Sequence, residues 1–277
     1  MPVIALTQEM GSLAKEVAER VAADLGIDVT RHEVADHVAD KMHVSKSLVN
    51  RLREGQAGKI ERMKADRASL AVYTAEEVLE RAARGNVVLR GWGATCLLRP
   101  VRHIVCVRVT RSLERRVEWL ATRLGTDDLG FAETEIRRSD RAHAANMAAR
   151  FAVTWGDPLL YDLVLNTDRI SVEGCAEQIR VLAARPEFAE TDASRARLQA
   201  MALEARIRAA LRADEKTRDV DVTIDITDSH VTLRGIVLDA AEKPVAARVV
   251  AAVPGVAGVD DQLHVMKSSR LFPAAKY

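Results

Sequence analysis

Apolar residues in the first part of the chain fall into short continuous runs and longer stretches with helical spacing. Residues 3–6 form an apolar run that predicts a buried strand, and a turn that contains Gly11 follows it. Residues 13–25 carry an apolar side chain at every fourth position, which predicts a helix that stops at Gly26. The chain therefore opens with a strand, a turn and a helix.

The same alternation continues beyond this opening. Residues 31–84 are charged and helical in pattern, with an interruption at 55–58. Strand signals then return at 87–89, 103–109 and 161–165, and helical stretches separate them. Strands that alternate with helices predict an α/β domain with a parallel sheet covered on both faces.

The pattern changes near Ala184. An amphipathic helix is expected at 198–211, followed by two strands, a helix and a last strand. These four elements lie at 220–226, 231–237, 240–253 and 262–266. The order αββαβ predicts a small α+β domain. The expected segments are a first domain at 1–184, a linker at 185–197, a second domain at 198–267 and a tail at 268–277.

Composition narrows the class of protein. The 277 residues are 48% hydrophobic and 29% charged, as in ordinary globular proteins. A net charge of +1 gives no reason to expect a nucleic-acid partner. Three cysteines without CxxC spacing indicate a reducing compartment. Because neither a signal peptide nor an apolar run of about 18 residues is present, we expect a cytoplasmic protein without a membrane span.

The turn after the first strand has the chemistry of an anion site. Backbone N–H groups and the dipole at a helix N-terminus attract phosphate, and residues 7–16 contain one glycine, one serine and one lysine. The strict phosphate-loop pattern GxxxxGK[ST] is absent. An ordinary helix start, with Ser12 as its cap and Lys15 in solvent, is the alternative.

Residues 3–27, VIALTQEMGSLAKEVAERVAADLGI, resemble the first strand, phosphate loop and helix of the cytidylate kinase-like family. That family typically carries Arg-Glu-Tyr-Gly-Ser-Gly-Gly-Arg-Glu at this place. The residues that match are Glu9, Gly11, Ser12 and Glu16. Leu13 and Ala14 replace the two following glycines, and Lys15 replaces the arginine.

Two later segments extend the resemblance to about residues 1–182. In 87–98 the matching residues are Gly91, Gly93 and Ala94, whereas Trp92 replaces an arginine. The run Trp-Gly-Asp-Pro at 155–158, with Tyr-Asp-Leu and Asn-Thr after it, resembles the family closely. A purely structural role for this run, with Asp157 as a cap, is the alternative.

A third part of the resemblance concerns the lid. Arg115 and Arg116 resemble its start, and Asp140 resembles the lid aspartate. His143 stands where an arginine is usual. The resemblance implies a P-loop kinase fold, with a five-stranded parallel sheet and a mobile helical lid. It also implies a reaction in which ATP and Mg²⁺ phosphorylate a nucleoside monophosphate or similar small acceptor.

The resemblance also implies a set of site residues. Those for nucleotide binding are Gly11, Ser12, Lys15, Gly91, Gly93 and Asp157. Those for catalysis are Lys15, Arg115, Arg116 and Asp140. No protein metal site is expected, because His32, His37 and His43 lie five and six residues apart and cannot share one helix face.

The departures from the family weaken the expected phosphate site. Leu13 and Ala14 add Cβ atoms where the backbone approaches phosphate. Trp92 and His143 each remove a guanidinium, and Arg31 replaces an acidic residue. We therefore expect weak or altered phosphotransfer. Two alternatives remain: a non-catalytic nucleotide-sensing or scaffold protein, and an interaction protein without a ligand at this loop.

The second domain resembles the BON domain. Val-Thr-Leu-x-Gly at 231–235 and Val-Pro-Gly-Val-x-x-Val at 253–259 carry the resemblance. BON-like domains are associated with phospholipid or small-ligand binding. Acidic residues balance the arginines of the helix at 198–211, so charge does not favour a membrane surface. The resemblance implies a small ligand or a protein partner for this domain.

Overall fold

The computed structural model describes residues 2–30, 32–54, 56–91 and 93–266. The chain divides into two compact units, residues 1–199 and 200–277. Arg31, Trp92 and the expected tail at 268–277, which were considered above, lie outside the described ranges. In the described part, no helix is both long enough and apolar enough to cross a membrane.

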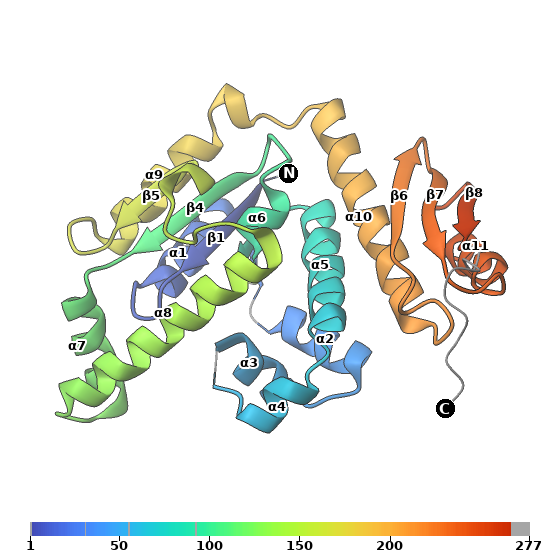
Figure 1. The fold of residues 1–277 in the computed structure, drawn as a ribbon. Coiled ribbons are helices and arrows are strands. Elements are labelled where there is room, and N and C mark those ends of the chain that lie inside the picture. The colour runs from blue at the N-terminus through green and yellow to red at the C-terminus, as the bar shows by residue number, and fades with distance from the viewer. Residues whose placement is uncertain (1, 31, 55, 92, 267–277) are drawn as a thin grey trace. The chain divides into compact units, whose positions relative to one another are not determined.

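The first unit contains the predicted five-stranded parallel sheet (Figure 1). Its strands are β1 (Val3–Gln8), β2 (Asp28–Val29), β3 (Val87–Arg90), β4 (Val105–Thr110) and β5 (Leu163–Asn166). They lie in the order β2-β3-β1-β4-β5. Val3 of β1 pairs with Val87, and Ile4 pairs with Val105. Parallel strands align their carboxyl ends, so the ends of β1, β3 and β4 meet at one edge.

Helices cover the sheet and extend beyond it. They are α1 (Ala14–Leu25), α2 (Glu33–Met42), α3 (Lys46–Glu54), α4 (Lys59–Lys64), α5 (Arg67–Arg84), α6 (Ala94–Leu98), α7 (Leu113–Leu124), α8 (Leu129–Phe151) and α9 (Val172–Ala183), with short 3₁₀ turns η1 (Pro158–Leu160) and η2 (Pro186–Phe188). Val17 of α1 and Ile179 of α9 share one buried core with Ile4 of the sheet. The helix start at residue 13 was thus predicted to within one position.

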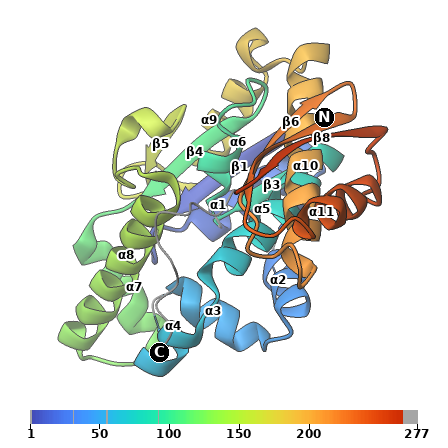
Figure 2. The same cartoon turned by 45° about the vertical axis from the view of Figure 1, so that its right-hand side comes forward.

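α7 and α8 lie side by side, as Figures 1 and 2 show. Val117 and Leu120 of α7 form a small core with Ala132 and Ile136 of α8. This helix pair, residues 113–151, stands where the resemblance places the lid. We call it the lid pair.

The charged stretch before β3 folds into helices α2 to α5, as predicted. In this stretch, the His37 side chain contacts two carboxylates. Its Nε2 lies 2.8 Å from Glu76 Oε2, and its Nδ1 lies 3.5 Å from Glu77 Oε2. Lys41 Nζ lies 3.6 Å from Glu76 Oε1. These ion pairs join α2 to α5. Among the described residues, no group of three or more His, Cys, Asp or Glu side chains could hold a metal ion.

The second unit has the predicted αββαβ order. Its elements are α10 (Asp192–Ala213), β6 (Val222–Thr227), β7 (His230–Val237), α11 (Glu242–Ala251) and β8 (Gly258–Val265). β7 is the central strand, antiparallel to β6 and parallel to β8. Asp228 and Ser229 adopt φ values of 49° and 67°, as a tight hairpin turn requires. Ile207 of α10, Leu233 and Val250 form the core.

Two element boundaries lie four or more residues from the sequence expectation. α10 begins at Asp192, inside the stretch expected to be a linker, and β8 begins at Gly258 rather than 262. The early helix start has a capping explanation. Ser194 N donates to Thr191 Oγ1 at 3.2 Å, and Thr191 N donates to Ser194 Oγ at 3.0 Å. Reciprocal bonds of this kind satisfy the first N–H groups of a helix.

The second unit should fold by itself when α10 is complete. We expect a fragment of residues 192–277 to melt cooperatively in circular dichroism, because α10 contributes Ile207 to its core. The control is Ile207→Asp, which buries a charge and should abolish the transition. A gradual loss of signal from the unsubstituted fragment would show that this unit depends on the first.

Candidate functional site

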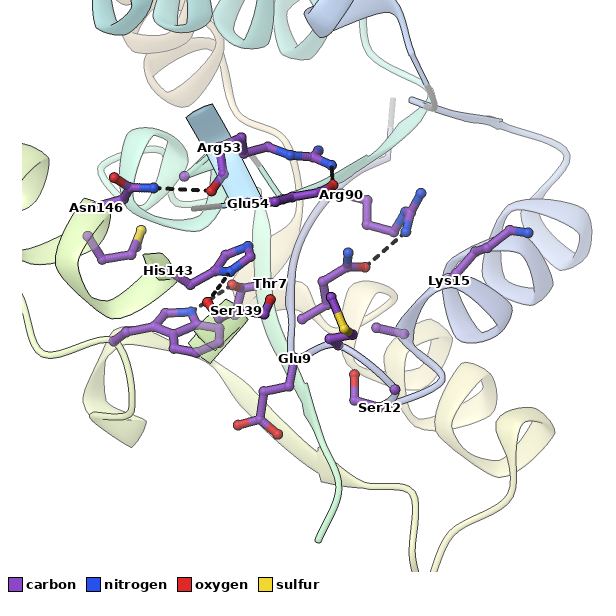
Figure 3. A pocket seen from close by; sticks show the side chains of 18 of the residues that line it. Thr7, Glu9, Ser12, Lys15, Arg53, Glu54, Arg90, Ser139, His143 and Asn146 are labelled. Atoms are coloured by element: carbon purple, nitrogen blue, oxygen red, sulfur yellow. Dashed lines mark hydrogen bonds and ion pairs between the residues drawn. The ribbon is translucent and has the colours of Figure 1, made fainter. Parts of the chain in front are cut away.

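A cavity of about 520 Å³ opens where β1 and β3 end (Figure 3). Its walls are the turn at 7–16, the end of α3, the start of α5, the segment after β3, the lid pair and Trp155. Cavities of this size bind small molecules. The location agrees with the general placement of ligands at the carboxyl ends of parallel strands.

The turn that carries the expected phosphate loop has an unusual backbone. Gly11 has a φ of 81° and Leu13 a φ of 59°, both left-handed. Leu13, not Ser12, is the N-cap residue of α1, and it makes no side-chain capping bond. The alternative in which Ser12 caps an ordinary helix is therefore wrong. Left-handed backbone costs a residue with a Cβ about 1–2 kcal/mol, and such strain concentrates at functional sites.

Ser12 is fully buried, at 0% exposure, yet its Oγ has no hydrogen-bond partner among the described residues. Its carbonyl accepts a bond from Thr167 Oγ1 at 2.9 Å, which holds the turn against the sheet. Buried hydroxyls nearly always have partners. Ser12 Oγ is therefore a candidate hydrogen-bond partner for a polar ligand atom bound at the turn.

Lys15 lines the cavity but is only loosely held. Its side chain is 54% exposed, and its Nζ lies 3.9 Å from Glu19 Oε1. Figure 3 shows Lys15 extending to one side of the cavity, with His143 on the other. An exposed ammonium with such a weak ion pair can turn toward an anion at little cost.

Gly91 and Gly93 also line the cavity, both with left-handed φ values, 77° and 73°. Gly93 is the N-cap residue of α6. A Cβ at Gly93 would lie 2.7 Å from the ring of Phe151, whereas a Cβ at Gly91 would meet no described atom within 4 Å. Gly93 is thus required for packing, and Gly91 is required for its backbone conformation alone.

Glu9 is the centre of a buried charge cluster at the base of the cavity. Its Oε1 accepts a bond from Arg108 at 2.5 Å, and its Oε2 accepts one from Thr110 Oγ1 at 2.7 Å. Arg116 Nη1 lies 3.6 Å from the same Oε2. Glu9 belongs to the turn, Arg108 to β4 and Arg116 to α7, so this cluster joins three elements.

Arg116 and Asp140, to which the resemblance assigns catalytic roles, bind each other. The guanidinium donates to both carboxylate oxygens, at 2.6 and 3.0 Å, and its Nε donates to the Met10 carbonyl at 2.7 Å. Neither residue lines the cavity. Arg115 is exposed and contacts Glu118 at 3.3 Å.

Asp157 also lies outside the cavity lining. Its Oδ1 accepts a bond from Leu159 N at 2.9 Å, so it caps η1. The predicted site residues therefore divide in two groups. Those that line the cavity are Gly11, Ser12, Lys15, Gly91 and Gly93, and those that do not are Arg115, Arg116, Asp140 and Asp157.

Four arginines that the sequence interpretation did not single out line the cavity: Arg53, Arg90, Arg123 and Arg150. Arg90 Nη1 donates to Gln8 Oε1 at 3.0 Å, and burial, together with the charge of Arg53, lowers the pKa of its guanidinium. Burial also lowers the pKa of Arg150. Only Arg90, at the carboxyl end of a strand, had a positional signal in the sequence.

The charges in the wall favour an anionic ligand. Lys15 and the four arginines supply five cations. The carboxylates are three: Glu9, Glu16 and Glu54. Glu9 is engaged with Arg108, and Glu54 is 2.6 Å from Arg53. Cations crowded in a partly desolvated cavity repel one another until an anion enters.

Aromatic rings complete the wall. Trp155 donates from Nε1 to Thr7 Oγ1 at 3.1 Å, and its carbonyl accepts a bond from Tyr161 Oη at 2.7 Å. The His143 ring stacks on Trp155 with centroids 5.3 Å apart. The Arg108 guanidinium lies 4.6 Å from the centre of the Trp155 ring. The Trp-Gly-Asp-Pro segment therefore contributes its tryptophan, rather than its aspartate, to the cavity.

Comparisons with known proteins agree with this architecture. The sequence profile of the cytidylate kinase-like family matches residues 3–169, and that of the BON domain matches residues 201–267. No curated protein matches the chain significantly. The fold and its cavity define a kinase-like α/β protein of the P-loop type. The chain belongs to the cytidylate kinase-like family, and its second unit is a BON domain.

Solved structures share the fold at low sequence identity. An uncharacterized protein from Eubacterium ventriosum superposes with a TM-score of 0.53 and 17% identity, over 67% of this chain and 100% of that one. Shikimate kinase from Bacteroides thetaiotaomicron gives a TM-score of 0.43 and 16% identity, over 65% and 97%. Only the first of these likenesses supports the fold, and at 17% identity it supports nothing beyond the fold.

The two cavity glycines provide a matched test of the wall. We expect Gly91→Ala to lower the free energy of unfolding by about 1 kcal/mol, the cost of left-handed backbone. Gly93→Ala should cost roughly 1–3 kcal/mol more, because its Cβ overpacks Phe151. Urea denaturation measures both. Equal losses for the two variants would contradict the contact between Gly93 and Phe151.

Proposed function

We propose that the first unit binds a nucleoside triphosphate with its phosphates at the turn 11–15 and transfers the γ-phosphoryl group slowly to a small acceptor. The observation that carries this proposal is the combination of an excess of cations and an unsatisfied Ser12 hydroxyl in one cavity at the N-terminus of α1. Helix dipole, backbone N–H groups and side-chain cations all favour phosphate there.

Different parts of the cavity wall are suited to the two reactants. The turn with Ser12 and Lys15 is suited to the transferred phosphates. Arg53, Arg90 and Arg150 line another part of the wall and are suited to an anionic group on the acceptor, because guanidinium groups bind phosphate and carboxylate well. Phosphoryl transfer depends on holding the two reactants in line and neutralising charge.

Mg²⁺ fits the turn as a companion of the triphosphate. The oxygens available to hold it are Ser12 Oγ, which has no partner among the described residues, and the carboxylate of Glu16. When bound, Mg²⁺ neutralises phosphate charge. Magnesium commonly takes only one or two protein oxygens and completes its shell with phosphate and water.

Three features predict slow transfer. Leu13 occupies left-handed backbone with a side chain where the family has glycine. Arg116 is held by Asp140 and Glu9 and does not reach the cavity. Lys15 extends into solvent. Leu13 hinders the approach of phosphate to the backbone, and the positions of Arg116 and Lys15 reduce the positive charge available to a transition state whose stabilisation is mainly electrostatic.

The same features support a second candidate, a protein that binds the nucleotide without turning it over. Arg116 forms ion pairs with Glu9 and Asp140. Its guanidinium could therefore reach a bound phosphate only if a buried ion pair were broken. In this candidate the BON domain binds a small ligand or a protein partner and responds to the nucleotide state of the first unit.

Calorimetric titration of the full chain with ATP and Mg²⁺ tests the proposal. We expect a dissociation constant of roughly 1 µM to 1 mM, the usual range for enzyme substrates. Phosphoryl transfer should then be followed with a panel of acceptors. Absence of heat and of thermal stabilisation at millimolar ATP would contradict nucleotide binding; binding without transfer to any acceptor would favour the second candidate.

Substitutions in the turn should change affinity in opposite directions. Lys15→Ala should abolish measurable ATP binding with the fold intact, because it removes the cation that the turn itself carries. Leu13→Gly should tighten binding by about tenfold, equivalent to about 1.4 kcal/mol, by clearing the approach of phosphate to the backbone.

Matched controls separate these effects from general damage. Lys59→Ala removes an exposed lysine of α4 that does not line the cavity, and should leave affinity unchanged. Leu13→Ala retains the Cβ and should recover less affinity than Leu13→Gly. Unchanged affinity in Lys15→Ala, or weaker binding in Leu13→Gly, would remove this turn from the binding site.

A further inference from the structure

His143 lines the cavity, and one of its two ring nitrogens has no hydrogen-bond partner among the described residues. Its Nδ1 lies 3.0 Å from the carbonyl oxygen of Ser139. A carbonyl can only accept, so Nδ1 carries the proton. Nε2 has no hydrogen-bond partner among the described residues, and His143 lines the cavity. In the neutral ring, Nε2 therefore offers a lone pair to whatever the cavity binds.

The ring is fixed in this orientation from two directions. Ser139 holds it from the preceding turn of α8, and Trp155 stacks on it with an interplanar angle of 21°. Trp155 is itself held by Thr7 and carries the Arg108 guanidinium near its ring. A base oriented through its second nitrogen by a fixed carbonyl is a recurrent arrangement in catalytic histidines.

The charged groups around His143 come from two helices. Arg53 and Glu54 approach from α3, and Asp140 lies one turn earlier on α8. Burial has the largest effect and lowers the pKa of His143; the Ser139 carbonyl acts in the opposite direction, and Arg53 lowers the pKa further. The imidazole is therefore neutral at pH 7, with its lone pair available.

We propose that His143 Nε2 accepts the proton from a hydroxyl group of the phosphoryl acceptor, and hence that the acceptor is a small anionic alcohol. This inference rests on the proposed phosphotransferase function. A neutral Nε2 can only accept a hydrogen bond, so it needs a donor from the ligand. The reacting oxygen of a phosphate acceptor carries no proton at neutral pH and can only accept, whereas the reacting oxygen of an alcohol carries an O–H group.

The chemistry balances with the nucleoside triphosphate as the other reactant. The acceptor oxygen forms a bond to the γ-phosphorus while the bond from that phosphorus to the β–γ bridging oxygen breaks. The bridging oxygen leaves with the electron pair as part of the nucleoside diphosphate. The hydroxyl proton passes to Nε2, which yields an imidazolium and a phosphate monoester. Kinases that phosphorylate hydroxyl groups commonly use a base to accept the hydroxyl proton in this step.

The first part of the test needs no acceptor. Long-range ¹H–¹⁵N spectra of the full chain, recorded against pH, report the tautomer and pKa of each histidine, and His143→Asn identifies the signal. We expect a proton on Nδ1 and a pKa below the ordinary value of 6.5. A pKa at or above 6.5, or a proton on Nε2 in the neutral ring, would overturn the proposal.

The second part compares acceptors and variants once ATP binding is established. Asparagine at residue 143 keeps a donor for the Ser139 carbonyl and removes the base. We expect His143→Asn to lower kcat by about a hundredfold, the lower end for general base catalysis, with the Kd for ATP unchanged. The acid limb of the wild-type pH profile should disappear. His264→Asn, an exposed histidine of the BON domain, is the control and should retain wild-type kcat.

The outcomes separate this inference from the function on which it rests. If ATP does not bind, the proposed function fails and the inference fails with it. If ATP binds and only nucleoside monophosphates are phosphorylated, with the same rate and pH profile in His143→Asn, the inference fails and the function stands. Transfer to anionic alcohols that depends on His143 supports both.

Discussion

The ion pairs of Glu9 are the constraint on which the rest of the site depends. One carboxylate in the turn after β1 holds Arg108 of β4 at 2.5 Å and lies 3.6 Å from Arg116 of α7. Asp140 of α8 completes the chain through Arg116. Removal of one member would leave a buried charge uncompensated, which typically costs about 3–5 kcal/mol. These ion pairs therefore hold the turn, the sheet and the lid pair in one arrangement.

That arrangement has opposite consequences for binding and for catalysis. It keeps the backbone of the turn open toward the cavity and leaves Ser12 Oγ without a partner among the described residues. It also commits Arg116 to carboxylates, so the cations that face the cavity come from other elements, such as Arg90 and Arg150. A site of this kind binds anions more readily than it stabilises a phosphoryl transition state.

Periodicity predicted a parallel sheet, the helical stretch before β3 and the αββαβ order of the second unit. The family resemblance implied five strands in the sheet, and the pattern missed β2 because this strand has only two residues. The pattern also missed the start of α10, because the capping pair Thr191 and Ser194 lies in a stretch with a linker-like composition. In the site, local motifs identified the turn and the two glycines. The arginines on α3 and α8 could not be found, because only tertiary packing brings Arg53 and Arg150 to the same wall. The replacement of an arginine by His143 was visible as a loss of charge; its stacking on Trp155 was not.

Hydrogen exchange with and without ATP and Mg²⁺ tests the central claim most directly, that the phosphates bind at the turn of the first unit. Peptides that cover residues 7–16 should exchange more slowly when the nucleotide is bound, because their N–H groups become hydrogen-bonded to phosphate. Peptides that cover 139–155 should be protected as well, since this part of the wall closes the same cavity. Unchanged exchange at 7–16 under saturating nucleotide, or protection confined to residues 200–266, would contradict the account.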